Sequence, residues 1–137
     1  MDDIGNKNGL QQGVKERMEK IEKAFGTVPF IFNIMSEEPE FFLSYCDMIE
    51  KIMLQPKHLS PKMLELTAIS AGAAVGGEHC LDVHLRLAKE HGATDGELFE
   101  AIIVGSVMSM TNVQGRALRR LANSKEEGKK EGGSKAP

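Results

Sequence analysis

The sequence contains no tryptophan and a single tyrosine, Tyr45, among its 137 residues. Aromatic residues make up 5% of the chain, so the stacking platforms that hold single-stranded nucleic acid are missing. The chain also lacks an excess of basic charge, because 17 lysine and arginine residues stand against 20 acidic ones. A nucleic-acid surface needs clustered positive charge, and we therefore expect no nucleic acid among the partners.

Long hydrophobic runs are absent as well. The longest weakly apolar stretch, residues 66–77, is mostly alanine and glycine and is too short to span a bilayer. Residues 1–9 lack the basic and apolar regions of a signal peptide. Two cysteines without an export signal are typical of a reducing compartment. These features predict a cytoplasmic protein without membrane segments.

Helix signals recur along the chain, whereas no stretch shows the alternation of a β-strand. The composition predicts one domain over residues 13–123, a flexible N-terminus over residues 1–12 and a disordered charged tail over residues 124–137. The fold expected for the domain is an all-α bundle of about six helices. Three of the expected helices are indicated by apolar stripes: Val14, Met18, Ile21 and Phe25; then Phe42, Tyr45, Ile49, Ile52 and Met53; and last Val113, Leu118 and Leu121. A buried helix over residues 63–75 follows the start signal Ser60-Pro61, and another helix covers residues 78–91. A helix over residues 97–110 follows the capping box at Thr94-Asp95-Gly96-Glu97.

Two of these helices, residues 63–75 and 97–110, are apolar on more than one face. A single small bundle cannot cover all such faces, so we expect a homo-oligomer. The alternative is that both helices pack centrally in a monomer.

Cys80 and His84 form the most informative pair of residues. Their spacing of four places them on one face of a helix, within reach of each other. Cys80 also falls in the first helical turn, where free backbone N–H groups favour an anion. Both features favour the thiolate, which is the reactive form of cysteine. The adjacent His79 is a second candidate proton carrier. A cysteine or histidine in a helix can also be an ordinary packed residue.

Glu65 interrupts an otherwise apolar helix between Leu64 and Leu66. A carboxylate near a core is costly unless it is paired, so Glu65 is expected to meet a proton donor or face a cleft. The small residues that follow it allow the next helix to approach and bring Cys80 and the histidines near. The alternative is that Glu65 simply reaches solvent. Cys46 is expected to be a packing residue.

The chain contains Glu65, then the run Gly77-Glu78-His79-Cys80, and then His84. With these residues it resembles, over about residues 13–120, the alkylhydroperoxidase D / carboxymuconolactone decarboxylase family. In the peroxidase branch, a glutamate is followed after eleven residues by Cys-x-His-Cys and then by a histidine. The chain matches this pattern except at Gly77, where the first cysteine would stand.

The resemblance implies an all-helical protomer that assembles into trimers or hexamers. It also implies that Cys80 attacks a hydroperoxide as the peroxidatic thiol, with Glu65, His79 and His84 as the proton relay. Gly77 cannot resolve the resulting sulfenic acid, which then needs another thiol to avoid further oxidation. We expect an external thiol in this role, with Cys46 or a loss of redox activity as alternatives. No cofactor is implied.

Two further functions remain open from the sequence. The first is a carboxy-lyase acting on a carboxylated lactone of aromatic catabolism, in which a histidine and a glutamate transfer protons without a cysteine pair. Arg86 is the basic residue nearest the motif for such a substrate. The second is a non-catalytic or metal-binding oligomeric subunit, with Cys80, His84 and Glu65 as three ligands for zinc.

Overall fold

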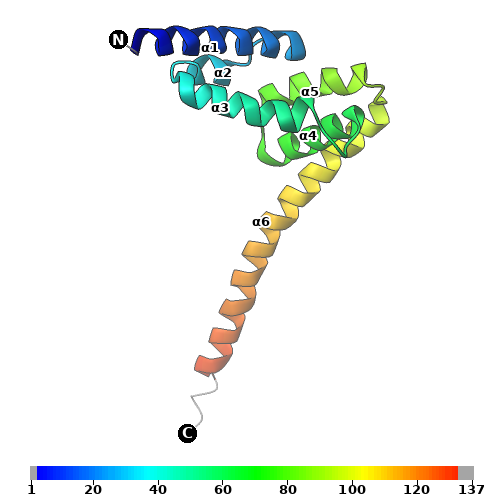
Figure 1. Ribbon diagram of the computed structural model, residues 1–137. Coiled ribbons are helices and arrows are strands. Elements are labelled where there is room, and N and C mark those ends of the chain that lie inside the picture. Colours follow the sequence, from blue (N-terminus) through cyan, green and yellow to red (C-terminus); the bar gives the residue numbers. More distant parts are fainter. Residues whose placement is uncertain (1–2, 133–137) are drawn as a thin grey trace.

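The computed structural model describes the backbone of residues 3–132 and the side chains of residues 7–128, and it is all-helical there (Figure 1). This confirms the predicted all-α class, with six α-helices in the described part of the chain. The elements are α1 (Asp3–Phe25), α2 (Phe30–Met35), α3 (Pro39–Ile49), the π-helical turn η1 (Glu50–Leu54), α4 (Pro61–Val75), α5 (Glu78–Glu90) and α6 (Asp95–Gly132).

Helix α1 begins earlier than the sequence predicts. Residues 3–12 belong to it rather than to a flexible segment, while residues 1–2 lie outside the described residues. The helix ends where expected, because Gly26 has a φ of 75°, a left-handed conformation that suits glycine after a helix. Extending a helix that is already nucleated adds one hydrogen bond per residue, and this explains how polar residues join its first turns.

The N-terminal helices share one apolar cluster. Its buried residues come from α1, α2, α3 and α5 and are Ile21, Phe25, Phe32, Phe42, Cys46 and Leu87. The short helix α2 was not predicted, because its six residues are too few to show a helical period. Arg17 ties α1 to the end of α3 and to η1, where it contacts the carboxylates of Asp47 and Glu50.

The second cluster joins α4, α5 and α6 through the buried residues Ile69, Ala88 and Leu98. Helix α5 therefore contributes to both clusters, with Leu87 in the first and Ala88 in the second. The predicted start of α4 is confirmed, since the Ser60 side chain accepts a hydrogen bond from the Met63 N–H. The predicted burial of α4 holds for one side only, because Met63 and Val75 are exposed.

Helix α6 corrects two predictions. The sequence predicts separate helices on either side of residues 111–112, but the structure has one helix from Asp95 to Gly132. No proline or left-handed residue stands at that point to end the helix. The predicted tail is helical as far as Gly132, while residues 133–137 lie outside the described part. Its lysine and glutamate residues are good helix formers that prolong an existing helix at little cost.

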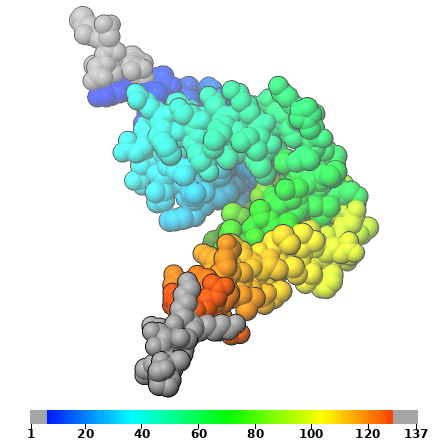
Figure 2. Space-filling view, turned by 90° about the horizontal axis from the view of Figure 1, so that it is seen from below, coloured from blue at the N-terminus to red at the C-terminus, as the bar shows by residue number. Residues whose placement is uncertain are grey.

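The arrangement leaves much of α6 outside the bundle. Its first turns pack on α4, and the remainder projects away from the other helices (Figure 1). A space-filling view shows a notch between the blue-to-cyan N-terminal helices and the orange part of α6 (Figure 2). Among the helices of residues 3–132, none is long and apolar enough to cross a membrane.

Candidate functional site

Glu65 is held inside the bundle by its position on α4. Its neighbours on the same side of the helix, Leu64 and Ile69, are buried, and the Glu65 residue itself is only 5% exposed. Burial of a carboxylate is unfavourable without a partner. Glu65 therefore needs a hydrogen-bond or ion-pair partner inside the bundle.

The partner is His84 on α5. Its Nδ1 atom lies 2.6 Å from Oε2 of Glu65, a distance typical of a short hydrogen bond or ion pair. Because Nδ1 is engaged by the carboxylate, Nε2 is the ring nitrogen left to exchange a proton. The alternative in which Glu65 reaches solvent is therefore wrong. A buried glutamate that orients a histidine is an arrangement suited to proton transfer.

Small residues on α4 permit this pairing, as the sequence predicts. A Cβ atom at Gly72 would lie 3.2 Å from a methyl carbon of Leu81 on α5, closer than most side chains tolerate. The glycine lets α5 lie against α4 at this level. The two helices then bring Glu65 and His84, 19 residues apart in sequence, into contact.

Cys80 lies in the first turn of α5, which begins at Glu78. The residue is exposed and its thiol is free. This position confirms the predicted helix start, and it leaves the sulfur accessible to a solute. His79 is exposed too, and within the described residues it forms no hydrogen bond or ion pair with Glu65 or His84. The geometry therefore joins two of the four predicted site residues directly and leaves the role of His79 a prediction.

Gly77 faces Cys80 across the start of α5. A Cβ atom at Gly77 would lie 3.7 Å from the Cβ of Cys80, and disulfides have Cβ atoms about 3.5–4.5 Å apart. Its other near contacts, to the backbone of Gly72, would be 3.9 Å. The backbone thus keeps the spacing of a cysteine pair at a position that has no thiol.

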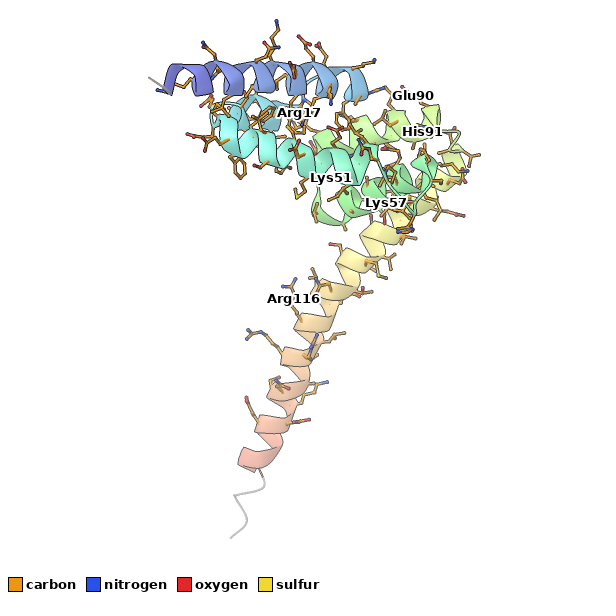
Figure 3. The ribbon with its side chains drawn as sticks, in the orientation of Figure 1. Arg17, Lys51, Lys57, Glu90, His91 and Arg116 are labelled. Atoms are coloured by element: carbon orange, nitrogen blue, oxygen red, sulfur yellow. The ribbon has the colours of Figure 1, made fainter. Side chains whose placement is uncertain are left out.

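Cys46 lies in a different environment. It is buried in the N-terminal cluster beside Phe42 and Ile21, and its thiol is also free. Burial raises its pKa above the ordinary value, and the nearby Arg17 guanidinium offsets this only in part. Arg17 reaches from α1 towards α3 (Figure 3). The prediction that Cys46 is a packing residue is confirmed, which weakens its candidacy as the resolving thiol.

The zinc alternative does not match the geometry. Nowhere in the described residues do three histidine, cysteine, aspartate or glutamate side chains gather as metal ligands would. Glu65 and His84 are paired with each other, and Cys80 does not complete a set with them. The three-ligand hypothesis was wrong for the described residues, because the contact between α4 and α5 brings Glu65 to His84 but does not bring Cys80 into the same group.

Arg86 has a structural role that its sequence position does not reveal. Its guanidinium donates hydrogen bonds to the carbonyl oxygen of Phe25, at the end of α1, and to Glu90 one turn further along α5. Basic side chains suit the free carbonyls of a helix C-terminus. These two contacts direct the guanidinium towards the end of α1 and along α5.

Comparisons with known proteins show which fold and family the chain is similar to. A search of curated proteins found no match. Among solved structures, a Burkholderia xenovorans LB400 protein described as a carboxymuconolactone decarboxylase is similar to the chain, with a TM-score of 0.65 and 23% sequence identity. The match covers 93% of this chain and 99% of the other, and at that identity it shows the fold. The model of the carboxymuconolactone decarboxylase family matches residues 39–123, more than half of the chain and the whole of the site described above. The chain therefore belongs to the carboxymuconolactone decarboxylase family, which also contains the alkylhydroperoxidase D-like proteins.

Proposed function

We propose that the protein reduces hydroperoxides at Cys80 and is regenerated by an external thiol. The observation that carries the proposal is the Glu65–His84 pair, 2.6 Å apart, with an exposed Cys80 one helical turn before His84. A thiol at a helix start with an oriented imidazole on the same helix face is the arrangement that nucleophilic thiol chemistry needs.

In the first step, the thiolate of Cys80 attacks the terminal oxygen of the hydroperoxide. An S–O bond forms as the O–O bond breaks, and the departing alkoxide takes a proton by way of His84, leaving as an alcohol. Cys80 loses two electrons and becomes a sulfenic acid, while the hydroperoxide gains them. Glu65 stabilises the imidazolium of His84, so that the histidine can hold a proton until the alkoxide needs it.

In the second half of the cycle, an external thiol condenses with the sulfenic acid. Water leaves and a mixed disulfide forms. A second external thiol attacks this disulfide, releasing Cys80 as a thiol and the two donor molecules as their disulfide. An external donor is required because position 77 is glycine and Cys46 is buried.

The test measures loss of hydroperoxide and dimedone labelling of each cysteine with a low-molecular-weight thiol as donor. We expect turnover and labelling at Cys80, both lost in Cys80→Ser and both kept in Cys46→Ser. Replacing Glu65 with glutamine should slow sulfenic acid formation roughly 10²-fold, the usual contribution of a positioned acid–base group. Labelling at Cys46 with Cys80 unmodified would exclude the proposal.

A second candidate is the lyase activity for which the family is named. The Glu65–His84 pair favours it too, since this pair can move a proton without any cysteine. The contacts of Arg86 weigh against it, because they direct the basic residue nearest the motif towards Phe25 and Glu90. Release of carbon dioxide from a carboxylated lactone by wild type and Cys80→Ser alike would favour the lyase.

A further inference from the structure

His84 lies on α5 at the place where the two apolar clusters of the molecule meet. Around the helix axis its position falls between Leu87, three residues further on, and Ala88, four residues further on. Leu87 is buried in the cluster of the N-terminal helices, and Ala88 is buried in the cluster of α4, α5 and α6. The imidazole therefore has α4 with Glu65 on one side and the N-terminal helices on the other.

This placement shields the contact between His84 and Glu65 from water. The side chain of His84 is 15% exposed and that of Glu65 is 7% exposed, so solvent has little access to the 2.6 Å contact between Nδ1 and Oε2. A hydrogen bond that is shielded from water is electrostatically stronger than one in solvent. The strength of the pair therefore depends on the contacts that keep the N-terminal helices against α5.

Arg86 fastens the end of α1 to α5 close to His84. Two residues after His84, it donates a hydrogen bond from Nη2 to the carbonyl oxygen of Phe25, the last residue of α1, and the end of α1 lies beside α5 (Figure 1). The Phe25 side chain belongs to the same buried cluster as Leu87. One hydrogen bond and one apolar cluster thus hold the same turn of α1. The second contact of Arg86, from Nη1 to Glu90 at 2.7 Å, stays within α5.

Gly26 leaves room for this guanidinium. The chain leaves α1 through Gly26 with a φ of 75°, and a Cβ atom there would lie 3.1 Å from Nη2 of Arg86, so the guanidinium would have to move. Gly92, which follows α5, has a similar φ of 81°, but a Cβ atom there would have no described atom within 4 Å. The two glycines therefore share a backbone conformation and differ in their contact with Arg86.

We propose that Arg86 is a positioning residue for the Glu65–His84 pair. By holding the end of α1 against α5, it keeps the N-terminal helices over the imidazole and preserves the shielded contact with the carboxylate. Arg86 acts through His84 and does not itself transfer protons or electrons. The kinetic part of this inference rests on the proposed reduction of hydroperoxides, whereas its structural part is measured on the resting protein.

The structural test records the low-field NMR proton resonance of a histidine N–H that is bonded to a carboxylate, on the full chain. We expect this resonance in wild type and assign it to His84 by its loss in Glu65→Gln. It should also be lost in Arg86→Met, which keeps an aliphatic side chain and removes the hydrogen-bond donors, with helix content unchanged by circular dichroism. Glu90→Gln should keep it, because that change affects only the contact within α5. An unchanged resonance in folded Arg86→Met would overturn the proposal.

Gly26→Ala tests the same contact from the side of α1. The added methyl group displaces the guanidinium, and the His84 resonance should weaken as it does in Arg86→Met. Gly92→Ala is the matched control, since it introduces the same left-handed strain without touching Arg86 and should keep the resonance. Equal losses in the two glycine variants would overturn the proposal, because backbone strain alone would then explain them.

Kinetics separate positioning from a general loss of stability. Arg86→Met should slow sulfenic acid formation at Cys80 by about tenfold or more, as a small misplacement of a catalytic group does. The double variant with Glu65→Gln should be no slower than Glu65→Gln alone, because both changes act on one pair; effects that multiply would overturn the proposal. If wild type consumes no hydroperoxide, the proposed function fails, while the His84 resonance still decides the role of Arg86.

Discussion

At the scale of single residues, the glycine at position 77 leaves Cys80 without a second thiol beside it at the start of α5. Cys80 is exposed and its thiol is free, as the proposed reaction with a hydroperoxide and a donor thiol requires. Gly77 has no side chain with which Cys80 could form a disulfide. The backbone nevertheless keeps a Cβ–Cβ spacing of 3.7 Å, within the range of real disulfides.

Replacing Gly77 with cysteine should therefore create a working dithiol. After one equivalent of hydroperoxide, we expect Gly77→Cys to lose both thiols to a disulfide between the introduced cysteine and Cys80, as shown by peptide mapping. Turnover should then continue with a dithiol reductant, because the sulfenic acid is now resolved within the chain. Gly77→Ala is the control: it should keep the native dependence on a monothiol donor, and persistence of that dependence in Gly77→Cys would contradict the prediction.

At the scale of elements, the start of α6 is fixed by a small polar network. The Glu97 carboxylate accepts hydrogen bonds from Lys62 Nζ of α4, at 2.8 Å, and from the Thr94 backbone N–H, also at 2.8 Å. The Thr94 hydroxyl in turn accepts from the Glu97 N–H at 3.2 Å, which completes the predicted capping box. The network joins the first turns of α4 and α6.

This network makes stability depend on pH in acid. The hydrogen bond from Lys62, followed by those from Thr94, lowers the pKa of Glu97 from 4.5 to about 2. A carboxyl whose pKa is lower in the folded state stabilises the fold above its unfolded pKa, and this contribution is lost as the pH falls from about 4.5 towards 2. Urea unfolding of wild type should show this loss. Glu97→Gln should flatten the profile in that window, and a profile identical to wild type would exclude the assignment.

Gly105 sets how closely α6 can lie on α4. A Cβ atom there would be 2.0 Å from the carbonyl oxygen of Ser70, a contact with rigid backbone that only helix separation relieves. We expect Gly105→Ala to lower the free energy of unfolding by about 3 kcal/mol or more, as for a severely overpacked core. Denaturant titration measures this.

Gly115 on the same helix is the matched control. The nearest atom to a Cβ there, Nη2 of Arg119, would be 3.9 Å away. Gly115→Ala should stabilise α6 by about 0.5–1 kcal/mol, because alanine favours a helix interior. Equal changes in the free energy of unfolding for the two substitutions would show that helix propensity, and not the contact with α4, determines the effect of Gly105→Ala.

At the scale of the whole molecule, the fold is open rather than compact. Two apolar clusters share α5, and Arg86 ties α5 to the last turn of α1. The projecting α6 and the notch beside it leave large apolar side chains uncovered (Figure 2). A monomer with this shape would gain stability by covering them.

If a second copy of the chain covers the apolar side chains exposed on α6, such as Ile103, Val107 and Leu121, thermal stability should depend on protein concentration. A tenfold rise in concentration favours association by about 1.4 kcal/mol, which should raise Tm by a few degrees. Scanning calorimetry across a hundredfold range of concentration measures this. The Tm of Leu121→Glu should stay constant, and a constant Tm in wild type would contradict the coupling of folding to association.

The sequence by itself determined the helical class, most helix boundaries and the residue types of the site. Local signals suffice for these, because a capping box at Thr94, a cap at Ser60 and a stopping glycine at position 26 act within a few residues. The four-residue spacing of Cys80 and His84 likewise follows from helical geometry alone. The sequence did not predict that α6 is unbroken. The apolar period is weak around residues 111–112, and without knowledge of the contacts between helices this resembles a helix end.

The tertiary structure alone decided which of these residues meet. Glu65 and His84 lie on different helices, and only the close approach of α5 to α4 at Gly72 brings their charges together. Packing also separated the two cysteines by environment, with Cys46 buried and Cys80 exposed. It brought Arg86 to the end of α1, where its guanidinium donates a hydrogen bond to the Phe25 carbonyl. Contacts between helices depend on their relative positions and angles, which the periodicity of each helix does not contain.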